Sequence, residues 1–285
     1  MTQRLRIAAI RFLNPAPLMY SFEHEPGRSR LASRYSIEET TPAECAARLA
    51  SARADIGLIP VAAHTSSLAI IPGCAIASRD RVRSILLVVR QPDGAEDMTR
   101  VRRVALDTAS RTSATYTRIL FSRFWRTQPE FLPHAPDLEA MLAVADAALL
   151  IGDPALFALE DREARQRRTG ERLLYLDLAH EWHRFTGTDW VSAFWSVRPE
   201  AIAGLTPAQV VDDFQHSRDA GLANIPALAD EWSARIAVPR ATILTYLSQN
   251  ISYHLDDAAL AGLDLFYRYG AECGVLPQAP SLRFL

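Results

Sequence analysis

A cluster of small polar side chains follows the apolar run at residues 104–106 and precedes a stretch with apolar residues at helical spacing. Strand, turn and helix in that order leave the first backbone amides of the helix without partners inside it. The helix dipole places partial positive charge at this end, and Arg111 adds a full charge. Ser110, Thr112 and Ser113 add hydroxyl donors. The turn therefore predicts a binding site for a carboxylate or a phosphate, with an ordinary helix N-cap as the alternative interpretation.

Three more candidate turns stand at strand ends, at residues 11–17, 78–84 and 152–154. They contain Asn14, Ser84 and the pair Gly152-Asp153. In a two-lobed α/β protein the ligand is held by strand-end turns of both lobes, so we expect these turns to converge with the serine turn. Asp153 could also act as a base. The alternative for Asp153 is structural, because aspartate before proline commonly caps a turn through its own side chain.

All 31 basic residues of the chain are arginine, and the sequence contains no lysine. This composition excludes Schiff-base lysines, pyridoxal-phosphate lysines and a Walker-type phosphate loop. A bound anion must then be held by guanidinium groups, hydroxyls or backbone amides. The formal net charge of -2 argues against a general binder of nucleic acid or of membrane surfaces.

Three isolated cysteines, the lack of an export signal and the lack of a membrane-spanning apolar run predict a reduced, soluble, cytoplasmic protein. His180 and His183 stand three residues apart, whereas the HExxH zinc motif needs a spacing of four. We therefore expect neither a metal nor a cofactor.

Strand-like and helix-like stretches alternate, which predicts an α/β fold with mostly parallel sheets. The predicted strands are residues 5–10, 35–40, 55–61, 83–90, 104–106, 147–151, 173–178 and 190–197. Thr206-Pro207 starts a helical segment, with further predicted helices at residues 241–252 and 256–273. Residues 160–172 carry charges on all sides and are interpreted as a solvated helix and loop.

Two α/β units, two crossings and a helical tail describe a bilobal protein of the periplasmic-binding-protein type. We expect residues 1–90 and 196–285 to form lobe I, and residues 91–195 to form lobe II. The polar segment at residues 91–99 is the expected crossing between the lobes. The ligand is then expected in the cleft between the lobes.

Six segments in a fixed order carry a family resemblance. They are FLNPAPL (12–18), DIGLIPVA (55–62), ASRDRVRSILL (77–87), ALDTASRTS (105–113), DAALLIGDPAL (146–156) and DLAHEWHRFTG (177–187). Together they resemble chorismate dehydratase of the futalosine route to menaquinone. The resemblance runs from the N-terminus to about Trp195 and departs at residues 188–195, where the family usually has a more apolar run.

The resemblance implies a type II periplasmic-binding-protein fold and the elimination of water from chorismate to give 3-[(1-carboxyvinyl)oxy]benzoate. It also implies a catalytic role for Asn14. Because an amide does not take up a proton, we expect Asn14 to position the substrate while a substrate carboxylate, or a water beside it, accepts the ring proton. The expected substrate-binding residues are Ser84, Ser110, Arg111, Thr112, Ser113, Gly152 and Asp153.

Two other functions remain open at this stage. The same fold serves as a non-catalytic binding protein or sensor for a small carboxylate, and as the effector half of transcription regulators. The missing export signal argues against an exported receptor, and residues 1–10 leave no room for a helix-turn-helix. The expected partner is a small dicarboxylate, with neither nucleic acid nor a membrane.

Overall fold

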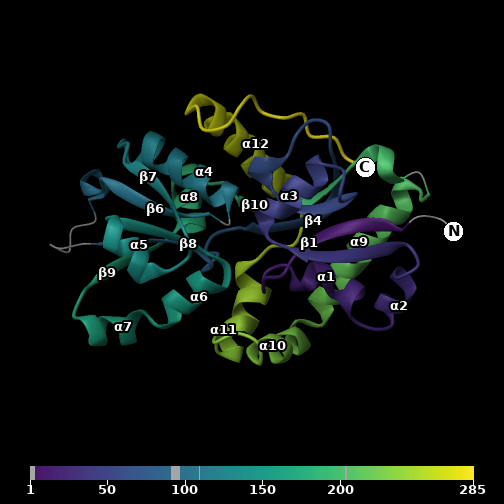
Figure 1. Ribbon diagram of the computed structural model, residues 1–285, viewed down its shortest axis with the longest axis horizontal. Helices are drawn as coiled ribbons and strands as arrows, with labels where there is room; N and C mark the ends of the chain where they lie inside the picture. Colours follow the sequence, from purple (N-terminus) through teal and green to yellow (C-terminus); the bar gives the residue numbers. More distant parts are fainter. Residues whose placement is uncertain (1–3, 91–96, 109, 203) are drawn as a thin grey trace.

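The computed structural model describes residues 4–90, 97–108, 110–202 and 204–285, which form two five-stranded sheets lying side by side along the long axis (Figure 1). The first sheet has the order β2 (Tyr35–Thr40), β1 (Leu5–Ile10), β3 (Ile56–Pro60), β10 (Trp190–Val197) and β4 (Ala69–Ser78). The second has the order β7 (Glu130–His134), β6 (Arg103–Asp107), β8 (Ala147–Ile151), β5 (Ile85–Arg90) and β9 (Leu173–Asp177). The predicted two-lobed α/β architecture is confirmed.

Helices pack around both sheets. In chain order they are α1 (Ala16–Glu23), α2 (Gly27–Leu31), α3 (Pro42–Ala50), α4 (Arg111–Ile119), α5 (Leu138–Val144), α6 (Gly152–Glu160), α7 (Arg162–Thr169), α8 (Leu178–Thr186), α9 (Pro207–Ala223), α10 (Ile225–Ser233), α11 (Arg240–Thr245) and α12 (Asp257–Glu272). Short π-helical segments continue α4 at Leu120–Phe124 and α11 at Tyr246–Asn250. No helix among the described residues has both the length and the apolar character to cross a membrane.

The two sheets are mixed, so the prediction of mostly parallel sheets is wrong for half of the strand pairs. β1 pairs in parallel with β2 and β3, and β6 with β7 and β8, because helical crossovers link these strands. β10 runs antiparallel between β3 and β4, and β5 runs antiparallel between β8 and β9. Each of these two strands is the first that the chain forms after it passes from the other sheet, and each is buried along most of its length.

The expected lobe boundaries need correction at these two strands. Residues 1–90 are expected in lobe I, but β5 belongs to the second sheet; residues 91–195 are expected in lobe II, but β10 belongs to the first. The chain therefore passes between the sheets at residues 79–84 and 178–189. Residues 91–96 of the expected crossing lie outside the described residues, and the strands on either side, β5 and β6, share one sheet.

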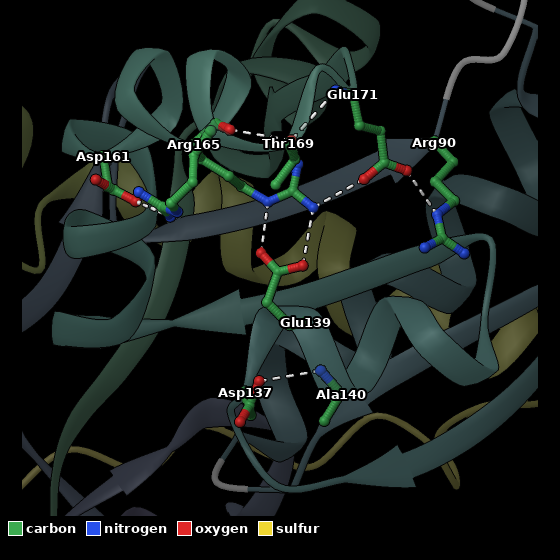
Figure 2. Close-up of polar contacts among 9 residues, drawn as sticks. Arg90, Asp137, Glu139, Ala140, Asp161, Arg165, Thr169 and Glu171 are labelled. Carbon is green, nitrogen blue, oxygen red and sulfur yellow. Dashed lines mark hydrogen bonds and ion pairs between the residues drawn. The ribbon is translucent and has the colours of Figure 1, made fainter.

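The charged segment at residues 160–172 is not solvated on all sides. Arg165 of α7 is only 4% exposed and donates two hydrogen bonds to Glu139 of α5, 2.6 and 2.9 Å long. A third bond, 2.8 Å long, reaches Glu171, which also accepts a hydrogen bond from Arg90 of β5 (Figure 2). Arg165 thus fastens α7 and the loop after it to the second lobe.

Two of the C-terminal helices, α9 and α12, pack closely against elements of the first lobe. α9 crosses α1 at such short range that a Cβ atom on Gly221 would lie 2.1 Å from the carbonyl oxygen of Pro17. α12 approaches the residue before β10 in the same way, since a Cβ on Gly262 would lie 2.1 Å from the carbonyl oxygen of Asp189. These approaches require glycine, and they fix the positions of α1 and β10, which border the site described next.

Candidate active site

A small cavity, with a volume of about 50 Å³ for a water-sized probe, lies where the two sheets meet. It is lined by residues of β1, β3, β4 and β10 from the first sheet and of β5 and β8 from the second. The structure brings five of the predicted site residues to this cavity: Asn14, Ser84, Ser110, Ser113 and Gly152. Their roles toward a ligand remain a prediction.

Four helices begin at the cavity, and each helix N-terminus carries a partial positive charge. Ser110 caps α4, Gly152 begins α6 and Pro42 begins α3, while Asn14 stands directly before Pro15, the N-cap of α1. None of the described residues that line the cavity carries a formal charge. An anion bound here would therefore be stabilised by helix dipoles, backbone amides and hydroxyl groups.

The Ser110 and Ser113 pair shows that the serine turn is both an N-cap and a source of donors. The Ser110 hydroxyl oxygen accepts a hydrogen bond from the Ser113 amide over 3.0 Å. The Ser110 hydroxyl then donates to the Ser113 hydroxyl oxygen, also over 3.0 Å. Because Ser113 already accepts this bond, its own hydroxyl hydrogen is available to a ligand in the cavity.

Ser84 is held at the start of β5 from two directions. Its carbonyl oxygen accepts a hydrogen bond from the Gly152 amide over 2.8 Å, and its hydroxyl oxygen accepts one from the Tyr246 hydroxyl over 2.7 Å. Gly152 has a φ of +61°, a conformation that favours glycine where β8 turns into α6. Complete burial raises the pKa of Tyr246, so this phenol stays protonated and donates.

Asn14 presents an acceptor to the same cavity. Its side-chain oxygen Oδ1 is buried and has no hydrogen-bond partner among the described residues. A buried acceptor without a partner costs free energy, and a ligand that donates a hydrogen bond there would recover it. The site thus combines hydroxyl donors with one unpaired acceptor.

Arg111, Thr112 and Asp153 lie beside the cavity rather than on its described lining. The Arg111 side chain is exposed. The Thr112 hydroxyl accepts a hydrogen bond from the Ala62 amide over 3.2 Å. Asp153 accepts one from the Leu13 amide over 3.4 Å, and burial raises the pKa of its carboxyl. Thr112 and Asp153 therefore connect the two lobes, and a role for these three residues toward ligand remains a prediction.

Two residues at the site escaped the sequence analysis. Tyr246 lies in the helical tail, and only the folded chain brings it to Ser84. Ser192 lines the cavity from β10, in the segment where the family resemblance departs. Two serines, Ser192 and Ser196, interrupt the apolar run WVSAFWSV and were the available signal, because a serine in a buried strand needs a partner. Asp189, in the same departing segment, is buried beside α12.

The described residues contain no group of three or more His, Cys, Asp or Glu side chains placed to hold a metal ion. His180 and His183 lie on α8 and have separate partners. His180 Nδ1 lies 2.5 Å from a carboxylate oxygen of Asp80, and His183 Nδ1 lies 3.3 Å from the carbonyl oxygen of Thr188.

Comparisons with known proteins identify a family and a fold for this chain. A family model described as menaquinone biosynthesis matches residues 5–272. Among solved structures, a protein from Archaeoglobus fulgidus is 13% identical, with 96% of this chain and 99% of that chain covered and a TM-score of 0.70. A Candida albicans protein with the generic periplasmic-binding-protein fold is 11% identical (97% and 92% covered, TM-score 0.64). The aliphatic sulphonate-binding protein of Escherichia coli is 17% identical (98% and 90%, TM-score 0.63). At these identities the structures establish the fold, which is of the periplasmic-binding-protein type.

Proposed function

We propose a reaction for this protein on the basis of its family: the chain belongs to the menaquinone biosynthesis family, whose model matches residues 5–272. The reaction is the dehydration of chorismate to 3-[(1-carboxyvinyl)oxy]benzoate. The segments around Asn14, Ser84 and Ser113 that resemble chorismate dehydratase are also the segments that meet at the cavity. This coincidence supports the finer assignment within the family.

The observation that carries the proposal is the balance of donors and acceptors in the cavity. Chorismate has two carboxylates, which accept hydrogen bonds, and one ring hydroxyl, which can donate one. The cavity offers hydroxyl donors at Ser84 and Ser113, helix N-termini, and the unpaired acceptor Oδ1 of Asn14. Donors fit the carboxylates, and the Asn14 oxygen fits the hydroxyl that leaves.

In the proposed elimination a ring C–H bond breaks and its electron pair forms the new ring double bond. The neighbouring C–O bond breaks, and the leaving hydroxyl takes up the proton that the carboxylate or water removed from the ring, so that it departs as one molecule of water. Asn14 accepts a hydrogen bond from the hydroxyl and fixes its orientation, while a substrate carboxylate or an adjacent water takes the ring proton. The product ring is aromatic, which provides the driving force.

The test is to mix chorismate with purified protein and follow both heat of binding and ultraviolet absorbance. We expect binding accompanied by an aromatic product that is lighter than chorismate by one water. If the protein binds chorismate but leaves it unchanged over hours, the dehydratase proposal is wrong.

A binding protein for a small carboxylate is the second candidate. Its support is the fold, which this chain shares with the sulphonate-binding protein named above, together with the donor-rich cavity. The same experiment separates the two functions, because a receptor would release chorismate unchanged.

A further inference from the structure

Ser192 occupies a β-bulge at the edge of the cavity. In the antiparallel pair of β10 with β4, Val191 lies opposite Ala77, whereas Ala193 lies opposite Ile76. β10 therefore carries one extra residue, Ser192, between two consecutive partners on β4. A bulge of this kind re-aims a side chain, and bulges are over-represented next to active sites. Here the re-aimed residue lines the same cavity as Asn14, Ser84 and Ser113.

The hydrogen bonding of Ser192 determines which way its hydroxyl can act. Its oxygen accepts a hydrogen bond from the indole Nε1 of Trp190 over 2.8 Å. An indole N–H can only donate, so the direction of this bond is fixed. The hydroxyl hydrogen of Ser192 therefore remains to be donated, and Ser192 lines the cavity where a ligand would receive it.

Packing holds the Trp190 indole, and with it Ser192, in place. Trp190 is fully buried and its ring stacks on that of Tyr116, with centroids 3.6 Å apart and an angle of 19° between the planes. The Tyr116 hydroxyl accepts a hydrogen bond from the Val191 amide over 3.3 Å. Tyr116 belongs to α4, whose first turn contains Ser113. The stacking of Trp190 on Tyr116 thus helps to position both Ser192, which lies on β10, and Ser113, which lies on α4.

We propose that Ser192 is a substrate-binding residue that donates a hydrogen bond to a carboxylate of the substrate. This inference rests on the proposed function, because it takes chorismate as the ligand. It assigns a role to the departure at residues 188–195: a polar donor lines the cavity in a segment where the family usually has a more apolar run. Ser192 then adds to the donors at Ser84 and Ser113, which come from other elements.

The experiment compares Ser192→Ala with Ser78→Ala in the full-length protein. Ser78 is the matched control, because it lies on β4 opposite Trp190 and its buried hydroxyl has no partner among the described residues. Calorimetric titration with chorismate is the readout, together with a thermal melt of each variant. A hydrogen bond to a carboxylate predicts roughly 10- to 100-fold weaker binding for Ser192→Ala. Ser78→Ala should bind like the wild type, and both variants should melt near the wild-type temperature.

A third variant tests the fixed direction of the hydroxyl. Trp190→Phe removes the indole N–H and lets the Ser192 hydroxyl rotate, so binding should weaken even though Ser192 is present. If wild-type protein binds and converts chorismate while Ser192→Ala binds it equally well, the inference about Ser192 is overturned and the proposed function stands. If the wild-type protein does not bind chorismate, the proposed function itself fails. The two outcomes are distinguishable, because the first is measured on Ser192→Ala and the second on the wild type.

Discussion

Tyr246 donates a hydrogen bond to Ser84 over 2.7 Å, although 162 residues separate them in sequence. Tyr246 lies in the π-helical segment that continues α11, and π-helical turns occur frequently at functional sites. The bond occupies an acceptor position of Ser84 and leaves its hydrogen for the cavity. The helical tail thus sets the hydrogen-bonding direction of a residue that lines the junction of the two sheets.

Removing this donor should weaken catalysis through Ser84. In Tyr246→Phe the Ser84 hydroxyl is free to rotate, and we expect kcat/KM for chorismate to fall by about tenfold. In the double variant with Ser84→Ala the two effects should not add, because the phenol acts only through that serine. Steady-state rates for the two single variants and the double variant measure this coupling.

Tyr253→Phe is the control for the loss of a buried phenol. Among the described residues the Tyr253 hydroxyl has no hydrogen-bond partner, so its removal should leave kcat/KM unchanged and the melting temperature equal or higher. Additive effects of Tyr246→Phe and Ser84→Ala would contradict the proposed link between them.

Asp153 gives a pH-dependent prediction. Burial raises the pKa of Asp153 in the folded protein, so its contribution to stability is greatest below the pKa of the unfolded chain and is lost as the pH rises through the folded value. Asp153→Asn keeps the acceptor for the Leu13 amide and removes the charge. The melting temperature of Asp153→Asn minus that of wild type should therefore become larger as the pH rises from about 4 to about 8.

The same variant also tests the competing assignment of Asp153 as the base. An asparagine cannot take up the ring proton, so a complete loss of turnover in a folded Asp153→Asn protein would favour Asp153 as the acceptor. We expect turnover to persist, because Asp153 is directed to the Leu13 amide rather than to the described lining of the cavity.

Arg165 should be the residue of the charged segment that matters most for stability. Replacing it with Met leaves Glu139 and Glu171 without their shared partner, at an expected cost of roughly 2 kcal/mol in unfolding free energy. Arg167→Met, on the same helix with a side chain 73% exposed, should change it little. Denaturant midpoints of the two variants provide the comparison. Equal midpoints would mean that the network in Figure 2 does not stabilise the lobe.

Much of the fold could be predicted from local sequence patterns. The apolar run of β5 and the serine turn before α4 are predicted because strand burial and helix capping depend on neighbouring residues. The sheet to which a strand belongs depends on the path of the whole chain, which is why β5 and β10 were assigned to the wrong lobes. Arg165 shows the same limit, because its partner Glu139 lies 26 residues away.

For the candidate site, the sequence predicted residues in strand-end turns and missed those placed by tertiary contacts. Asn14, Ser84 and Ser113 stand at the ends of strands or starts of helices, where ligand sites are expected. Ser192 reaches the cavity only through a bulge defined by pairing with β4, and Tyr246 only through packing of the tail. The serine at position 192 is visible in the sequence, but the strand pairing and the packing that bring Ser192 and Tyr246 to the site are not.

The mass of the product formed from chorismate, measured side by side for wild-type protein and Asn14→Ala, is the strongest test of the proposed dehydration. We expect the wild type to release a product lighter than chorismate by one water. Asn14→Ala should bind chorismate within about tenfold of wild type and form no product, because the amide orients the leaving hydroxyl and one such hydrogen bond contributes only about 1 kcal/mol to affinity. Near-normal kcat in Asn14→Ala would contradict the role of Asn14, and unchanged chorismate with the wild type would contradict the proposed reaction.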